Sequence, residues 1–180
     1  MDPAHERNTV ISTLQDATDR LVASVNVRLI PPEGISFGFA LRGARDNGGV
    51  GAVSSGIKTG PGGGITAGAC AFGTDEPVVR IILTAMKFDP VMRCAAVLQF
   101  SERAQSVFEN DLFLDCASMD TASKNRGIST MDWDIASCCQ KSVPDVIFRH
   151  GTVTADSRII LFGEGPADVL NNIIICSNRI

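Results

Sequence analysis

Short apolar segments alternate with segments of helical periodicity along most of this 180-residue chain. The predicted strands cover residues 35–41, 50–53, 65–72, 94–100, 112–117, 143–148 and 158–162. The predicted helices cover residues 4–24, a segment from a Thr74 N-cap through Met86, residues 101–110, residues 129–140, and a segment that begins at Pro166. Strands that are apolar at nearly every position need cover on both faces. The order therefore predicts an α/β layered domain with helices on both faces of a largely buried sheet.

The length of the chain predicts one main domain with an appendage. Residues 1–24 are expected to form an amphipathic N-terminal helix, because Val10, Leu14 and Leu21 recur at helical spacing. Residues 25–180 are expected to form the α/β domain.

Charge and hydropathy exclude several classes of protein. The net charge is −4 and the sequence pI is about 5.1, which argues against a broad nucleic-acid footprint. No run of about 18 uncharged apolar residues is present, so a membrane span is not expected. A charged N-terminus without an apolar core, and six cysteines without a CxxC pair, predict a cytoplasmic protein with reduced thiols.

Histidine is scarce, and tyrosine is absent from the sequence. Only His5 and His150 could serve as imidazole ligands or bases. A site that needs two or three histidines, as in most zinc hydrolases, is therefore not expected, and we predict no metal-binding residues.

Thirteen of the 17 glycines lie between Gly34 and Gly73. Within this cluster, residues 51–59 approach the spacing of a phosphate-binding P-loop, but Ile57 separates the last glycine from Lys58. The backbone amides and the lysine of a P-loop must converge on one phosphate, so this spacing argues against a nucleoside triphosphatase. Lys58 and the glycines at 60–64 could form either a phosphate-contacting loop or a flexible hairpin tip.

Several polar residues follow predicted strands, where ligand sites form in α/β proteins. Arg45 could grip a phosphate, and Asp46 could orient it or help to hold Mg²⁺; a surface turn with a local ion pair is the alternative. A hydroxyl-rich loop then leads into a predicted helix N-terminus, which could bind an anion or be simply capped and solvated. The predicted ligand-binding residues are Arg45, Asp46, Ser118, Asp120, Ser129, Thr130 and Met131. His150 ends a strand and is either a base or a satisfied strand-end side chain.

Five strings, in order and with compatible spacing, resemble the ThiN family of thiamine-phosphate synthase domains, found mostly in archaea. They are Phe39–Asp46, Leu83–Pro90, Phe100–Glu102, Ser129–Trp133 and Val143–Ile147. The resemblance runs from about residue 25 to the C-terminus. It implies a three-layer α/β/α domain with a mixed sheet, akin to class II aldolases but without their zinc histidines. The family reaction joins an aminopyrimidine methyl diphosphate to a thiazole phosphate and releases pyrophosphate.

The chain departs from the synthase pattern at four positions. By the resemblance, Gly56 stands where the family has a catalytic arginine, and Pro77 where it has a histidine. Ser36 and Val97 stand where the family has two asparagines. Loss of a charge-stabilising or acid–base group typically lowers the rate by ~10² to 10⁴. We assign no catalytic residue; Lys58 and His150 are the remaining candidates.

The resemblance extends to archaeal regulators, in which a ThiN-like domain without that arginine and histidine senses thiamine phosphate beside a DNA-binding domain. The leading hypothesis is a sensing domain that binds thiamine phosphate or a related phosphorylated ligand, with a DNA-binding domain in cis or in trans. The alternative is an active thiamine-phosphate synthase. Binding would need no cofactor, whereas catalysis would need Mg²⁺. We expect a homodimer, for which the N-terminal helix is a candidate interface, and no membrane association.

Overall fold

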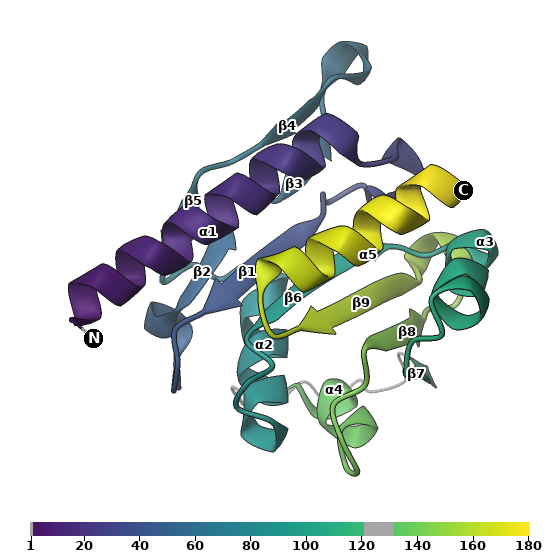
Figure 1. The fold of residues 1–180 in the computed structure, drawn as a ribbon. Helices are drawn as coiled ribbons and strands as arrows, with labels where there is room; N and C mark the ends of the chain where they lie inside the picture. Colours follow the sequence, from purple (N-terminus) through teal and green to yellow (C-terminus); the bar gives the residue numbers. More distant parts are fainter. Residues whose placement is uncertain (1, 121–131) are drawn as a thin grey trace.

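A mixed sheet of seven strands forms the centre of the molecule (Figure 1). The computed structural model describes residues 2–120 and 132–180. The strand order is β5-β2-β1-β6-β9-β8-β7, and β7 and β8 are the parallel pair within it. Its strands are β1 (Ser36–Ala40), β2 (Val50–Val53), β5 (Cys70–Phe72), β6 (Cys94–Gln99), β7 (Cys116–Asp120), β8 (Val146–His150) and β9 (Arg158–Gly163).

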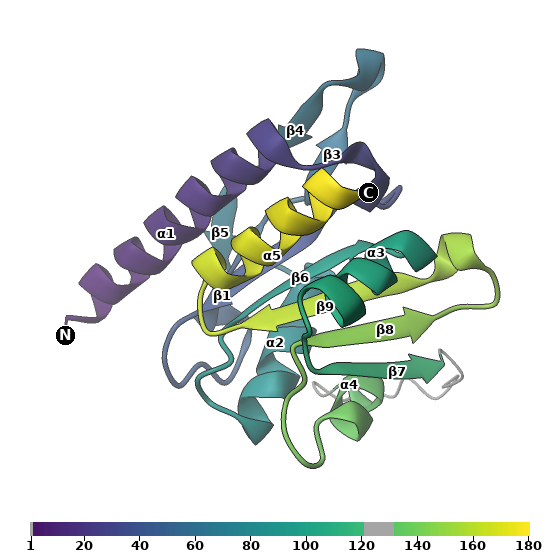
Figure 2. The same cartoon turned by 45° about the vertical axis from the view of Figure 1, so that its right-hand side comes forward.

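Helices cover both faces of this sheet (Figures 1 and 2). On one face, α1 (Pro3–Ser24), α3 (Glu102–Ser106) and α5 (Pro166–Arg179) enclose a core with Phe37, Phe108 and Phe148. On the other face, α2 (Pro77–Phe88) and α4 (Trp133–Cys138) enclose a second core with Ile82 and Ile135. The predicted three-layer α/β/α arrangement with a mixed sheet is confirmed.

Helix α1 packs directly on the sheet, as expected from the helical spacing of its apolar residues. Asp2 caps it through a hydrogen bond from the backbone N–H of Ala4, and Pro3 occupies its first turn. Leu14 and Leu21 are fully buried in the same core as strand β1. The apolar face of α1 is therefore covered by its own chain. No helix among the described residues is long and apolar enough to cross a membrane.

The predicted strand at residues 65–72 is two strands. β4 (Ile65–Ala67) pairs with β3 (Ile57–Thr59) in a separate hairpin, whereas β5 returns to the edge of the main sheet. The chain passes so close to Ser54 at this break that a Cβ on Gly68 would overlap the Ser54 carbonyl oxygen. The small residues of this segment thus indicate close packing, as expected, but not one continuous strand.

Three other predicted boundaries differ from the structure. Helix α2 begins at Pro77 with Glu76 as its N-cap, not at Thr74, because proline is favoured in the first turn. Strand β7 begins four residues later than expected, because a π-helical turn, Val107–Asp111, extends the preceding helix. Helix α4 is capped by Asp132 and ends at Cys138. The predicted cap at Ser129 lies outside the described residues.

Candidate functional site

A cleft of about 600 Å³ lies beside the N-terminal turns of α2. It is lined by Arg45, Asp46, Asn47, Thr74, Asp75, Glu76, Pro77, Val79, Arg80, Ile81, Leu83, Asp132 and Arg149. The lining combines side chains from the β1–β2 loop, the segment before α2, helix α2 itself, the N-cap of α4 and strand β8. Clefts of this size that gather charged side chains from several elements are the default candidates for a small-molecule site.

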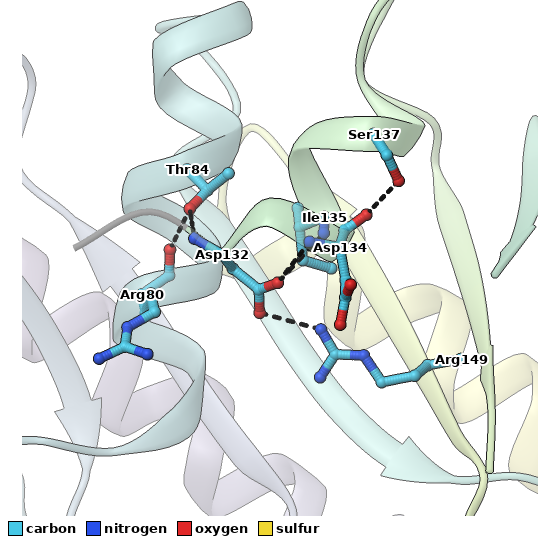
Figure 3. Close-up of polar contacts among 7 residues, drawn as sticks. All are labelled: Arg80, Thr84, Asp132, Asp134, Ile135, Ser137 and Arg149. Atoms are coloured by element: carbon cyan, nitrogen blue, oxygen red, sulfur yellow. Dashed lines mark hydrogen bonds and ion pairs between the residues drawn. The ribbon is translucent and has the colours of Figure 1, made fainter. Parts of the chain in front are cut away.

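An ion pair between Asp132 and Arg149 forms one wall of the cleft (Figure 3). Arg149 Nη2 donates to Asp132 Oδ2 at 2.9 Å, and the two side chains are 17% and 18% exposed. Asp132 Oδ1 accepts from the backbone N–H groups of Asp134 and Ile135, both at 3.1 Å. The backbone N–H of Asp132 donates to Thr84 Oγ1 on α2 at 2.9 Å. Asp132 therefore ties α4, α2 and β8 together.

Two buried polar atoms of the lining lack hydrogen-bond partners within the part of the chain that the structure describes. They are Thr74 Oγ1 and Arg149 Nε, and each carries a hydrogen that it could donate. A buried donor without a partner costs about 1–3 kcal/mol. Both atoms belong to residues that line the cleft, so hydrogen bonding beside the cleft is incomplete among the described residues.

The structure places the predicted residues Arg45 and Asp46 on the lining of the same cleft. Both are exposed, and Asp46 Oδ1 accepts from the backbone N–H of Gly48 at 3.0 Å, which caps a short turn at Asn47–Gly49. Arg45 and Asp46 are thus brought to the cavity that Asp132 and Arg149 also line, although about 100 residues separate the two pairs in sequence. Their role in binding stays a prediction.

Ser118, Asp120 and His150 do not line this cleft. Ala117 and Met119 of β7 pack on the core beside α2 and α4. Because side chains alternate along a strand, Ser118 and Asp120 belong to the opposite face of the sheet. His150 also lies on that opposite face, where its ring packs edge-on against Phe100 at 5.3 Å. Ser129, Thr130 and Met131 lie outside the described residues.

Lys58 is also absent from the cleft lining. It is exposed on β3, in the hairpin that projects beyond the main sheet (Figure 1). The glycines that follow it form the tip of this hairpin, with a short turn at Pro61–Gly63.

The four positions that depart from the synthase pattern gather around the start of α2. Ser36 lies opposite Val97 in the β1–β6 ladder, and its Oγ accepts from the backbone N–H of Val78 at 3.2 Å. Pro77 is the first residue of α2 and lines the cleft. Gly56 follows Ser55, whose backbone N–H donates to Glu76 Oε1 at 2.8 Å. These contacts bring four segments of the chain together at the first turn of α2.

The backbone at Gly56 is built for glycine. Its φ is +72°, and a Cβ there would lie 2.7 Å from the carbonyl oxygen of Ile35. A side chain at this position would need both a left-handed backbone and a shift of Ile35, the residue before β1. A side chain such as arginine could therefore be placed at Gly56 only if the main chain at Ile35 moved.

The described cysteines are not activated nucleophiles. Burial raises the pKa of Cys116 and of Cys139 to about 11, and that of Cys176 to about 12. Thiolate is the reactive form, so these thiols stay protonated near neutral pH. Within residues 2–120 and 132–180, no group of three or more His, Cys, Asp or Glu side chains is arranged to hold a metal ion.

Sequence reasoning missed Thr74, Arg80, Asp132 and Arg149 as residues of the cleft. The alternation of β8 offered one signal, because it places Arg149 on the same face as buried Ile147. Asp132 precedes an apolar segment of helical periodicity, a position that is typical of a helix N-cap. Neither signal says which polar residues share a cavity, because that depends on the order of the strands.

Comparison with known proteins places these observations in a family context. The sequence profile of the family described as thiamine-phosphate synthase ThiN matches residues 13–175. The bifunctional thiamine biosynthesis protein ThiDN of Methanocaldococcus jannaschii is 27% identical over 156 residues. That match covers 85% of this chain and 37% of the relative, so the chain spans little more than a third of the relative's length.

Two crystal structures share the fold. The C-terminal domain of protein MJ0236 superposes with a TM-score of 0.83 and 26% identity, over 96% of this chain and 95% of that domain. The C-terminal domain of a phosphomethylpyrimidine kinase superposes with a TM-score of 0.82 and 24% identity, over 95% of this chain and 100% of that one. The mixed seven-stranded sheet with helices on both faces is thus an arrangement found in solved domains.

Proposed function

Because this chain belongs to the ThiN family of thiamine-phosphate synthases, we propose that it binds thiamine phosphate or a related phosphorylated ligand in the cleft beside α2. We further propose that it senses this ligand and does not turn it over efficiently. The observation that carries the proposal is the type of residue found at and next to the N-terminus of α2. Gly56 and Pro77 stand where the family pattern has its arginine and histidine, while the adjacent cleft retains charged side chains.

Catalysis is disfavoured by the chemistry available at the start of α2. A glycine cannot stabilise the charge that develops on a leaving diphosphate, and a proline cannot transfer a proton. Binding makes smaller demands, because a cleft with cationic and hydroxyl donors can hold a phosphorylated ligand without any of these groups. Binding requires no cofactor under this proposal, and Mg²⁺ would be needed only for turnover.

A sensing role also implies a partner that reads the bound state. We propose a DNA-binding domain in cis or in trans, acting on a homodimer of this domain, by analogy with the regulators that the sequence resembles. The described N-terminal helix buries its apolar face on its own sheet. A dimer would therefore use another surface, or the outer face of α1.

Titration calorimetry with the purified chain tests the binding proposal. Thiamine phosphate should bind and raise the melting temperature, and an unrelated phosphate ester such as glycerol phosphate serves as the negative control. Absence of both heat and thermal stabilisation with every thiamine compound would refute the proposal.

An active synthase is the alternative, favoured by the similarity of this chain to the bifunctional thiamine biosynthesis protein of Methanocaldococcus jannaschii. Its test is product formation from the aminopyrimidine methyl diphosphate and the thiazole phosphate with Mg²⁺. Loss of that product in Lys58→Ala or His150→Ala would establish rearranged catalytic groups. Because neither residue lines the cleft, we expect no product from the unaltered chain.

A further inference from the structure

Two arginines face each other across neighbouring strands beside the cleft. Arg149 of β8 and Arg158 of β9 are partners in the antiparallel ladder, so their side chains leave the same face of the sheet. Like charges directly opposite each other are destabilising unless they are compensated. Each of the two therefore has its own carboxylate, Asp132 for Arg149 and Glu33 for Arg158.

The guanidinium of Arg158 is fully engaged. Its Nε and Nη2 donate to the two carboxylate oxygens of Glu33 at 2.6 and 3.0 Å. Its Nη1 donates to the carbonyl oxygens of Ala155 and Ser157 at 2.7 and 2.8 Å. All three nitrogens have acceptors, and Arg158 does not line the cleft. This arginine is a structural clamp.

The guanidinium of Arg149 differs from that of Arg158, because only part of it is hydrogen-bonded among the described residues. Nη2 donates to Asp132, whereas the buried Nε has no partner among the described residues. Guanidinium presents its donors as a rigid fork, so the orientation that Asp132 imposes also fixes the direction of the remaining N–H groups. Asp132 is itself held by α4 and Thr84, which makes the arrangement preorganised (Figure 3).

The charges around the cleft restrict the class of ligand. Among the described residues, the lining carries three arginines, Arg45, Arg80 and Arg149, and four carboxylates, Asp46, Asp75, Glu76 and Asp132. A ligand with only negative charge would meet more carboxylates than cations. A ligand that combines a phosphate with a positively charged ring satisfies both signs, because each end can lie near opposite charge.

From these observations we infer that Arg149 binds the phosphate of a zwitterionic phosphorylated ligand, and that Asp132 is the positioning residue that aims it. Thiamine phosphate, with its cationic thiazolium ring, belongs to this class. The assignment rests on the proposed function and adds two points to it. The first is a phosphate-binding residue, and the second is a charge rule, which says that the ligand carries both a phosphate and a positive charge. The rule disfavours the polyanionic diphosphate precursor.

The test pairs two ligands with two charge-matched variants. Calorimetry with thiamine phosphate and with thiamine measures the preference for the phosphate in the unaltered chain, Arg149→Gln and Arg158→Gln. A hydrogen-bonded charge pair predicts that the unaltered chain prefers thiamine phosphate by about 10- to 100-fold. Arg149→Gln should lose this preference by weakening binding of thiamine phosphate alone. Arg158→Gln removes the same charge from the adjacent strand and should keep the preference.

Two further variants separate binding from folding. Arg149→Lys keeps the charge without the planar fork, and should also lose most of the preference. Asp132→Asn keeps an oxygen to cap α4 but no longer pairs with Arg149 as a carboxylate, so the preference should fall while the helix remains. Far-ultraviolet circular dichroism confirms that each variant is folded at the titration temperature.

The outcomes distinguish this inference from the proposed function. If the unaltered chain binds thiamine phosphate and Arg149→Gln binds it equally well, the assignment of Arg149 is wrong while the proposed function stands. If both arginine variants lose the preference equally, long-range charge explains it, and Arg149 is not the phosphate-binding residue. If the unaltered chain binds neither thiamine compound nor inorganic phosphate, both proposals fail. Tighter binding of inorganic pyrophosphate than of thiamine phosphate would overturn the charge rule.

Discussion

Replacing Gly56 by alanine should destabilise the fold more than the same change at Gly43. Both residues have left-handed backbone, with φ of +72° and +69°. They differ in surroundings, because a Cβ at Gly56 would lie 2.7 Å from Ile35 O, whereas nothing lies within 4 Å at Gly43. Gly43→Ala is therefore a matched control that carries the cost of the left-handed backbone but not the clash.

The two costs can be estimated separately. A non-glycine residue in the left-handed region costs about 1–2 kcal/mol, and the lower entropy of the unfolded chain offsets about 0.4–1 kcal/mol of that. Gly43→Ala should therefore lower the free energy of unfolding by about 1 kcal/mol. Overpacking adds about 1–3 kcal/mol, so Gly56→Ala should lower it by about 2–4 kcal/mol. In a chain of this size, each kcal/mol corresponds to about 2–4 °C in melting temperature.

Urea unfolding followed by circular dichroism and by fluorescence of the single tryptophan, Trp133, measures both variants. Equal destabilisation would refute the reasoning, because it would show that the main chain at Ile35 moves away from the added Cβ without cost. The unequal result has a functional consequence. Gly56→Arg alone should then fail to create synthase activity, because the backbone of this chain does not offer the arginine a place.

Three further predictions concern stability. Leu14→Ala in α1 should lower the free energy of unfolding by about 2–5 kcal/mol, because it leaves a cavity in the core. Arg20→Ala, on the exposed side of the same helix, should change it by less than about 0.5 kcal/mol. Equal effects of the two variants in urea titrations would show that α1 contributes little to the core. Asp132→Ala should be less stable than Asp132→Asn by about 1 kcal/mol, because asparagine can still cap α4, and identical melting curves would contradict this. Burial raises the pKa of Cys116 and Cys139 to about 11 in the folded chain, above the usual thiol value of 9.0. The unfolded chain then loses these protons first, so the free energy of unfolding should fall as pH rises from 9 toward 11. Cys139→Ala should flatten that slope in urea titrations at successive pH values, and an unchanged slope would argue against the thiol.

Local signals in the sequence located many elements well. Ser101 caps α3, and Pro166 begins α5, as predicted from their helix-start chemistry. The apolar run at 94–100 is the central strand β6, because only a strand covered on both faces tolerates so many apolar residues. Errors arose where two local signals competed. Thr74 and Pro77 are both typical of a helix start, and in the structure the helix begins at Pro77.

The candidate site was partly accessible from sequence. The sequence predicts Arg45 and Asp46 as ligand-binding residues because they follow a strand, and both line the cleft in the structure. The sequence predicts Ser118 and Asp120 to lie in a polar ligand-binding loop, but β7 starts later than expected, which places both residues within a strand and on the other face of the sheet. A change of a few residues in strand register decides the face on which a side chain lies, and local composition does not specify that register.

The sequence by itself determined the layers of this protein, because the periodicity of apolar residues reports which side of each element is buried. It also carried the resemblance to the ThiN family, to which the chain belongs. Only the tertiary structure decided that Asp132 and Arg149 share a cleft with Arg45, and that the main chain at Gly56 has no room for a side chain. The physical reason is that contacts between distant segments depend on strand order and backbone path, which no local pattern encodes.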